Sequence, residues 1–263
     1  MLVAGIDVGS LTAKAVLLKD NNIVASAVIR ATTRPARSAE EVLSKALEKA
    51  GKTRGDVAQS VATGYGRNQI PFVDQVASEI ACHARGAVWR LPSVRTIIDI
   101  GGQDAKAARV DAQGNVIRYG YNDKCASGTG RFLEVMAEAL EVPLEQLGAL
   151  SQKSTDPVRI SSQCVVFAET EVISLLNKGR EVPDVIAGLH LALAGRVAAL
   201  ARSISLEPDV VFTGGVAKNS GVAAALEKEL GISLKFLDID PQINGAAGAA
   251  LFAAEALSGR MSA

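Results

Sequence analysis

The stretch that decides the fold is residues 96–106, which read Thr96-Ile97-Ile98-Asp99-Ile100-Gly101-Gly102-Gln103-Asp104-Ala105-Lys106. A short apolar run that ends in paired glycines predicts a buried strand followed by a tight turn. Residues 111–114 (Asp-Ala-Gln-Gly) then predict a hairpin turn, and a helix is expected to start near Arg131. The glycine turn and Cys125 therefore lie at opposite ends of one hairpin.

The same pattern occurs earlier in the chain, at residues 7–14. Asp7-Val8-Gly9-Ser10-Leu11-Thr12-Ala13-Lys14 and residues 99–106 both read Asp-x-Gly-x-x-x-Ala-Lys, and their first residues, 7 and 99, are 92 positions apart. Two hairpins can resemble each other by chance, but motif and context recur together here, which favours a duplicated fold. Duplicated lobes would form a cleft to which each lobe contributes one loop.

Composition excludes several classes of protein. The 263 residues carry 28 basic and 28 acidic side chains, and 48% are hydrophobic, with a mean hydropathy of +0.21. A net charge of zero gives no electrostatic basis for binding nucleic acid or an anionic membrane. We find no run of about 18 apolar residues and no basic region at the N-terminus, so we expect a cytoplasmic protein.

The remaining elements alternate between strands and helices. Residues 38–50 predict a helix with Ser38 as N-cap, Glu41 three residues later and Gly51 at its end. Strands are expected at 4–8, 15–18, 23–29, 57–63, 209–212 and 234–237, and further helices at 73–87, 132–140, 143–147, 167–176, 185–203, 222–230 and from 245 onward.

Three glycine turns follow buried strands: Gly9-Ser10, Gly101-Gly102 and Gly214-Gly215. Glycine lets backbone N–H groups approach phosphate oxygens. The hydroxyls of Ser10 and Thr12 and the ammonium group of Lys14 add donors, and Asp7 and Asp104 could hold hydrated Mg²⁺. Neither a Walker A sequence nor GxGxxG is present, which disfavours P-loop and Rossmann folds.

This ordered set resembles the actin, Hsp70 and sugar-kinase superfamily. The resemblance implies an α/β fold of duplicated ribonuclease H-like, actin-like ATPase lobes around a nucleotide cleft. Residues 1–93 with the C-terminal helix 244–263 would form the first lobe, and residues 94–243 the second. Residues 7–14 and 99–104 would be the phosphate loops, 213–217 the adenosine loop, and 78–84 and 244–250 the connecting helices at the hinge.

The predicted site residues follow from these loops. The cofactor-binding set is Gly9, Ser10, Leu11, Thr12, Ala13, Lys14, Gly101, Gly102, Gln103, Gly214, Gly215, Val216, Asn219 and Gln242. The catalytic set is Asp7, Gln103 and Asp104, with the water-activating residue left open between Gln103 and Asp104.

The chain contains three cysteines, and a disulfide scaffold is not expected in a cytoplasmic chain of this length. Cys82 is predicted to be a small buried residue of a helix. Cys125 and Cys164 precede predicted helices, whose N-termini stabilise thiolates. A cubane iron–sulfur cluster usually takes four thiolates, and two chains would together supply four, which predicts a homodimer with one bridging cluster. The alternative is that both cysteines are unremarkable.

Residues 122–132 and 161–169, with 62–67 and 97–106, closely resemble the 2-hydroxyacyl-CoA dehydratase activators of the BadF/BadG/BcrA/BcrD ATPase family. This resemblance implies an oxygen-sensitive homodimer with one [4Fe-4S] cluster held by Cys125 and Cys164. ATP hydrolysis with Mg²⁺ would drive a low-potential electron from ferredoxin or flavodoxin to a dehydratase or a benzoyl-CoA-type reductase component. Lobe closure would act on the cluster through the hairpin. A heterodimer with a paralogous subunit remains open, as does the identity of the acceptor.

Two other functions fit the same superfamily. A sugar or amino-sugar kinase without a cluster would need an acceptor pocket with a catalytic Asp. A regulator or filament protein would use the nucleotide only to change shape.

Overall fold

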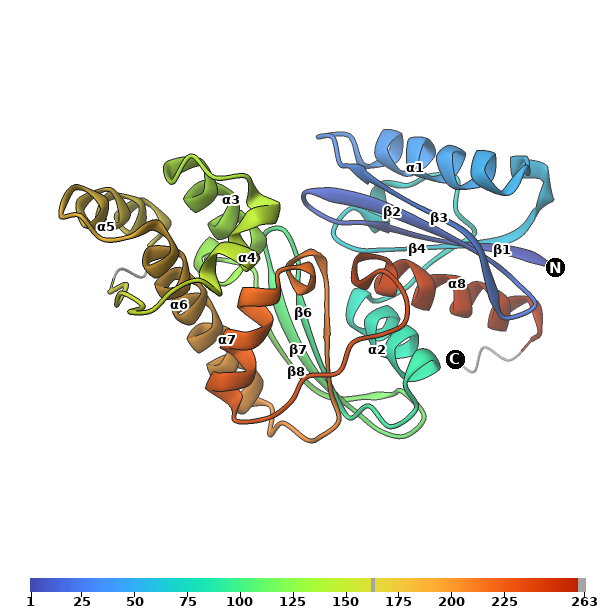
Figure 1. Ribbon diagram of the computed structural model, residues 1–263. Coiled ribbons are helices and arrows are strands. Elements are labelled where there is room, and N and C mark those ends of the chain that lie inside the picture. The colour runs from blue at the N-terminus through green and yellow to red at the C-terminus, as the bar shows by residue number, and fades with distance from the viewer. Residues whose placement is uncertain (162–163, 260–263) are drawn as a thin grey trace. The chain divides into compact units, whose positions relative to one another are not determined.

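The computed structural model describes residues 1–161 and 164–259 and has an α/β fold with two sheets (Figure 1). The chain divides into two compact units. Unit 1 comprises Met1–Ile97, Val110–Ile117 and Leu237–Ala263, and unit 2 comprises Ile98–Arg109 and Arg118–Phe236. The lobe boundaries expected from the sequence stay a prediction. Ser162 and Gln163 of the cysteine motif lie outside the described residues, as do positions 260–263.

Unit 1 contains a five-stranded sheet with the order β3-β2-β1-β4-β5. Its strands are β1 (Leu2–Val8), β2 (Thr12–Lys19), β3 (Asn22–Arg30), β4 (Val57–Thr63) and β5 (Gln75–Val76). The first three strands pair as antiparallel hairpins, and β1 and β4 are parallel. Every residue of β1 is buried, as expected for a central strand covered on both faces.

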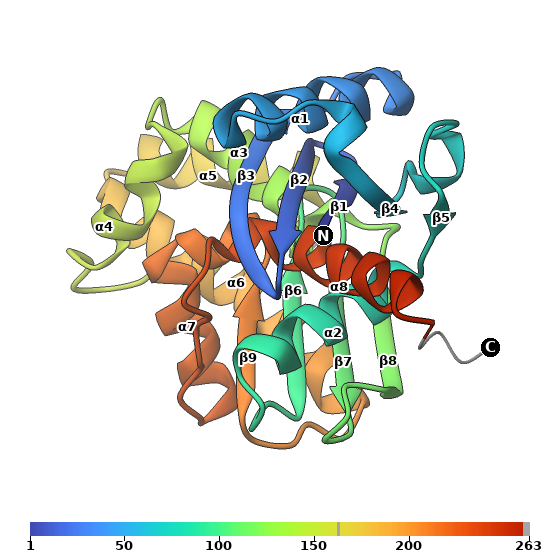
Figure 2. The same cartoon turned by 90° about the vertical axis from the view of Figure 1, so that its right-hand side faces the viewer.

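Helices cover both faces of this sheet. Helix α1 (Pro35–Ala50) packs on one face against β2 and β3, and α8 (Asn244–Leu257) packs on the other against β1 and β4 (Figures 1 and 2). Helix α2 (Glu79–Arg90) lies against α8. A Cβ atom at Gly248 would overlap the carbonyl group of Cys82, so this helix crossing requires glycine there.

The second sheet has the order β8-β7-β6-β9. It is built from β6 (Thr96–Ile100), β7 (Ala105–Val110), β8 (Val116–Asn122) and β9 (Val210–Thr213). The helices of unit 2 are α3 (Gly130–Ala139), α4 (Leu147–Ser151), α5 (Val165–Asn177), α6 (Val182–Ser203) and α7 (Ser220–Leu230). Ile98 and Ile100 of β6, Phe132 and Met136 of α3 and Leu193 of α6 belong to one hydrophobic core.

Three predicted elements were wrong in detail. Helix α1 begins at Pro35 with Arg34 as N-cap, because proline suits the first helical turn; Ser38 lies inside the helix and accepts the N–H of Thr32. Residues 73–78 are not helical but contain β5. The strand expected at 234–237 is reduced to a bridge between Val211 and Lys235.

Helix α6 is the described element that comes nearest to a membrane span, although charged residues interrupt its apolar sequence. It has 22 residues, and among the described helices it alone has the length and hydropathy of a membrane span. However, 61% of its apolar window is buried. That burial is typical of a core helix.

Candidate functional site

The first glycine turn joins β1 to β2 and is closed by one hydrogen bond, from Gly9 N–H to the carbonyl oxygen of Thr12 at 3.0 Å. The Lys14 ammonium group lies 3.1 Å from Oδ2 of Asp7. The Asp7 side chain is buried, and within residues 1–161 and 164–259 its Oδ1 has no hydrogen-bond partner. A buried carboxylate oxygen without a donor could accept a hydrogen bond from a water molecule of hydrated Mg²⁺.

The second glycine turn repeats this geometry between β6 and β7. Gly101 N–H donates to the carbonyl oxygen of Asp104 at 2.9 Å. The Lys106 ammonium group lies 3.6 Å from Oδ2 of Asp99 and 2.6 Å from Oδ2 of Asp104, and Lys106 is 1% exposed. The hydrogen bond that closes the turn and the lysine–aspartate ion pair thus both recur 92 residues later in the chain. The repeated motif therefore has the same local geometry in both units.

A second pair of matching turns was only half recognised from the sequence. Gly64 follows β4 with φ of 86°, and Gly214 follows β9 with φ of 87°. A Cβ atom at either position would clash with a backbone carbonyl group, that of Val8 for Gly64 and that of Ile100 for Gly214. Val8 and Ile100 are again 92 positions apart. The signal in the sequence was a Thr-Gly pair after each buried strand.

The other residues predicted to bind the cofactor in unit 1 differ in accessibility. Ser10 is exposed, and Leu11 and Thr12 are half-buried. Ala13 is fully buried in the core of unit 1, which leaves its methyl group unavailable to a ligand. Gln242 lies in the 3-10 helix Pro241–Ile243.

In unit 2, Gly102 and Gly215 are half-buried, Gln103 is exposed and Val216 is buried. Asn219 serves as the N-cap of α7, since its Oδ1 accepts the N–H groups of Gly221 and Val222. Its Nδ2 lies 3.3 Å from Nε2 of His190. The side chain of Asn219 therefore has a structural role whether or not it also contacts a ligand.

The thiol group of Cys125 is exposed and lies in a polar environment. Its Sγ lies 2.9 Å from Oγ of Ser127, and Arg196 of α6 donates to the same hydroxyl oxygen. The hydrogen bonds with Ser127, and then the positive charge of Arg196, hold the pKa of the Cys125 thiol below its usual value. Thiolate is the form that ligates iron. No spacing in the sequence connects Arg196 to Cys125, and both Arg196 and Ser127 were missed.

Cys164 is also exposed and forms the N-cap of α5. Cys82 is buried, as predicted, and burial raises the pKa of its thiol to about 12. Where the chain is described, no three His, Cys, Asp or Glu side chains are grouped to hold a metal ion. The thiols of Cys125 and Cys164 are free and exposed, which is the chemistry that ligation of an iron–sulfur cluster requires of them.

The Cys125 loop is joined directly to the second glycine turn. A 3-10 turn, Ala126–Gly128, separates Cys125 from α3. The first two N–H groups of α3, from Gly130 and Arg131, donate to the carbonyl oxygens of Gly101 and Gly102 at 2.9 and 2.7 Å. Cys125 is the N-cap of this 3-10 turn and not of α3, whose first two N–H groups are occupied by the glycine turn.

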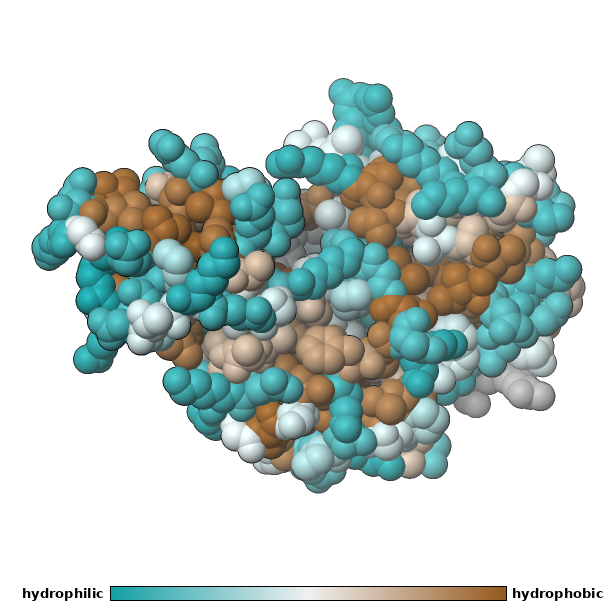
Figure 3. Space-filling view, viewed as in Figure 1, coloured by the Kyte–Doolittle hydropathy of each residue, from teal (hydrophilic) through white to brown (hydrophobic). Residues whose placement is uncertain are grey.

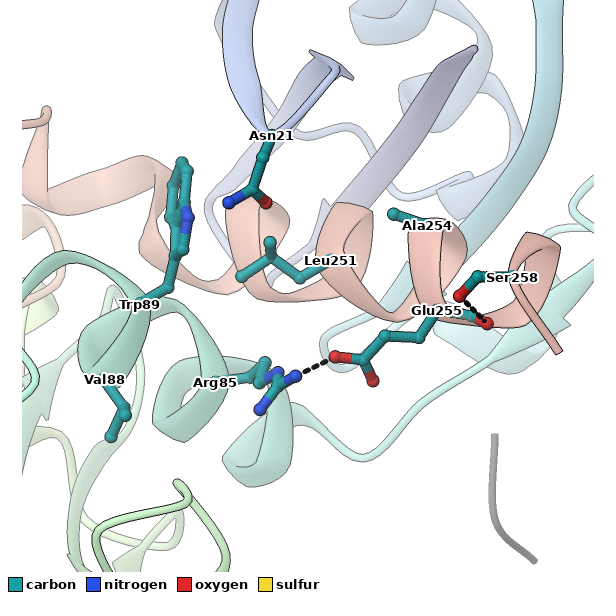
Figure 4. A pocket seen from close by; sticks show the side chains of 8 residues that line it. All are labelled: Asn21, Arg85, Val88, Trp89, Leu251, Ala254, Glu255 and Ser258. Atoms are coloured by element: carbon teal, nitrogen blue, oxygen red, sulfur yellow. Dashed lines mark hydrogen bonds and ion pairs between the residues drawn. The ribbon is translucent and has the colours of Figure 1, made fainter. Parts of the chain in front are cut away.

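Unit 1 also contains a cavity of about 420 Å³ (Figure 4). An ion pair between Arg85 and Glu255 crosses it. Its other lining residues are Asn21, Val88, Trp89, Leu251, Ala254 and Ser258. None of these eight residues belongs to the predicted site.

Comparison with known proteins identifies the family. Residues 4–253 match the sequence model of the BadF/BadG/BcrA/BcrD ATPase family. The chain is 50% identical to the (R)-2-hydroxyglutaryl-CoA dehydratase activating ATPase of Acidaminococcus fermentans, over 95% of each chain. The activator of the 2-hydroxyisocaproyl-CoA dehydratase from Clostridium difficile, solved with bound ADPNP, superposes with a TM-score of 0.94 at 43% identity, over 100% of this chain and 99% of that one.

The fold extends further than the family. A ROK family glucokinase from Streptomyces griseus aligns with a TM-score of 0.59 at 15% identity, over 97% of this chain and 100% of the kinase. At that identity the likeness shows the fold alone, and it confirms the predicted actin-like ATPase fold. Because a family match over nearly the whole chain accompanies the high identity to an activator, the chain belongs to the BadF/BadG/BcrA/BcrD ATPase family.

Proposed function

We propose that this chain is an ATP-dependent electron-transfer activator of a 2-hydroxyacyl-CoA dehydratase. Two copies would hold one [4Fe-4S] cluster through Cys125 and Cys164, and ATP hydrolysis would accompany the transfer of an electron to the dehydratase. The relatives described above act on dehydratases of two different 2-hydroxyacyl-CoA thioesters. They support a dehydratase as the acceptor; a benzoyl-CoA-type reductase component is the alternative acceptor, and the acyl group of the substrate stays open.

The observation that carries the proposal is the link between the Gly101-Gly102 turn and the Cys125 loop. Carbonyl oxygens of the turn accept the first two N–H groups of α3, five and six residues after Cys125. A phosphate group bound by N–H groups of the turn would reorient these same peptide units. Nucleotide binding at the turn would then move the segment that carries Cys125.

Three loops are the candidates for binding the nucleotide. We assign the phosphates to the loops at 7–14 and 101–104, and the adenosine to residues 213–217 with Asn219 and Gln242 nearby. Asp7 and Asp104 would hold hydrated Mg²⁺, and Gln103 or Asp104 would orient the attacking water. Within the described part of the chain, Oδ1 of Asp7 has no hydrogen-bond partner. This supports the assignment, since a site for phosphoryl chemistry mainly positions groups and stabilises charge.

The surface beside Cys164 supports pairing of two chains. Val166 and Phe167, the second and third residues of α5, are 66% and 68% exposed, and Ile173 on the same helix is 47% exposed. Figure 3 shows hydrophobic surface in the region where Figure 1 draws α5. Large apolar side chains gathered on a surface are typical of a contact with another protein. A second copy on this face would bring its own Cys125 and Cys164 to the cluster.

When bound, a [4Fe-4S] cluster would accept one electron from reduced ferredoxin or flavodoxin and release it to the dehydratase component, while ATP and water give ADP and phosphate. The chain's own residues would set the properties of that centre. Ser127 and Arg196 stabilise negative charge on the Cys125 sulfur, and hydrogen bonds to ligand sulfurs are one determinant of a cluster's potential.

Anaerobic purification tests the proposal. We expect a brown protein with about four irons per two chains and an ATPase activity that falls when the cluster is removed. Addition of the protein, ATP and a reduced ferredoxin should activate a 2-hydroxyacyl-CoA dehydratase. A colourless protein that phosphorylates a sugar, or one that polymerises with ATP, would instead select one of the two other functions.

A further inference from the structure

The Cys125 loop is attached to the second glycine turn on both of its sides. After Cys125, the attachment is the pair of backbone hydrogen bonds from Gly130 and Arg131 described above. Before Cys125, the attachment runs through a side chain, that of Tyr121 at the end of β8. Two attachments to one loop hold the segment between them, so a shift at either one is passed to Cys125.

Tyr121 contacts two charged groups of the turn at once. Its hydroxyl group donates to Oδ2 of Asp104 at 3.1 Å. The Lys106 ammonium group lies 5.2 Å from the centre of the tyrosine ring, within cation–π range, and 2.6 Å from the same Oδ2. Lys106 is buried and fixed, whereas Tyr121 is 40% exposed. Of these two donors, Tyr121 is therefore the one with room to move away.

The next residue continues the connection. The side-chain amide of Asn122 donates through Nδ2 to the carbonyl oxygen of Cys125 at 3.0 Å. Asp104 and Cys125 are thus joined by two hydrogen bonds and the single peptide bond between Tyr121 and Asn122. A displacement of the tyrosine would be transmitted to the cysteine through this short path.

We propose that Tyr121 is a positioning residue that conveys the state of the Asp104 carboxylate to the Cys125 loop. The inference rests on the proposed function, in which Asp104 engages the water shell of nucleotide-bound Mg²⁺. That shell competes with the tyrosine hydroxyl group for Oδ2. When the competition displaces Tyr121, Asn122 shifts and the backbone of Cys125 follows.

Hydrogen–deuterium exchange tests this in the anaerobically purified protein, with and without a non-hydrolysable ATP analogue and Mg²⁺. The readout is the change in amide protection over residues 122–131 on nucleotide binding. In Tyr121→Phe, which keeps the ring over Lys106 but removes the donor, we expect most of this change to be lost. Tyr119→Phe is the matched control, since Tyr119 precedes it by two residues on β8 and is more exposed; its response should equal that of the wild type.

Asn122→Asp removes the next donor in the path and should reduce the response in the same way. Nucleotide affinity of Tyr121→Phe should be unchanged or higher, because a competitor for Asp104 has been removed; a loss of affinity would place Tyr121 in the binding site and overturn the proposal. An unaltered exchange response in Tyr121→Phe, or no response in the wild type, would also overturn it. Iron content is measured in parallel. If the wild-type protein shows the expected change in amide protection but contains no iron, the result counts against the proposed function alone.

Discussion

Replacement of Lys106 by Met should strongly destabilise unit 2. The Lys106 side chain is 2% exposed and is the cation between Asp99, 4% exposed, and Asp104, 21% exposed. Methionine has a similar length but no charge, so the buried carboxylate of Asp99 would lose its compensating cation. Removal of one partner of a buried ion pair typically costs about 3–5 kcal/mol.

In a chain of this size, such a loss lowers Tm by roughly 6–20 °C, at about 2–4 °C for each kcal/mol. Differential scanning calorimetry measures it. Lys14→Met is the matched control in the other repeat, where the lysine is 13% exposed and pairs with Asp7; it should cost less, because one carboxylate is affected instead of two. Asp99→Asn added to Lys106→Met should recover part of the stability. The reasoning would be refuted if Lys106→Met had the Tm of the wild type, or if Lys14→Met had a lower Tm than Lys106→Met.

Three further predictions concern other parts of the chain. Burial lowers the pKa of His190 to about 4 from 6.5. As the pH falls, His190 is protonated in the unfolded chain before it is protonated in the folded chain, so the free energy of unfolding should fall by up to about 3 kcal/mol between pH 6.5 and 4. Urea unfolding at several pH values measures this dependence, and His190→Gln should flatten it. In cluster-free protein, Arg196→Gln should slow iodoacetamide alkylation of Cys125, since less of the thiol would be ionised; an equal rate would exclude Arg196 as a cause of the lowered pKa. At Gly195 in α6, a Cβ atom would meet no other described atom within 4 Å, so Gly195→Ala should raise the free energy of unfolding by up to about 1 kcal/mol. At Gly248, a Cβ atom would overlap the carbonyl group of Cys82, so Gly248→Ala should lower it by about 1–3 kcal/mol or more.

The repeated motif was predictable because its pattern is local. A buried strand, a glycine turn and a second strand are each encoded within a few residues, and they recur at 7–14 and 99–106 with the same hydrogen bond and ion pair. The exposure of Cys125 and the burial of Cys82 likewise agree with their polar and apolar surroundings in the sequence. The local sequence pattern was therefore sufficient to locate the two glycine turns and to distinguish the exposed Cys125 from the buried Cys82.

The contacts that give these loops their chemistry were not predictable in this way. Arg196 reaches Ser127 across 69 positions of the sequence, and Tyr121 reaches Asp104 only because β7 and β8 are neighbours in the sheet. Local errors have local causes: Ser38 has the chemistry of an N-cap, but Pro35 starts the helix earlier. Long-range packing decides which polar side chains meet, and the local patterns of the sequence do not reveal that packing.

The central claim is that two chains share one inorganic cluster through two cysteines each. Native mass spectrometry of the anaerobically purified protein tests it most directly. The claim predicts a species with the mass of two chains plus a single [4Fe-4S] unit, and its loss in both Cys125→Ala and Cys164→Ala. A wild-type species without iron, or a variant that retains the full cluster mass, would contradict it.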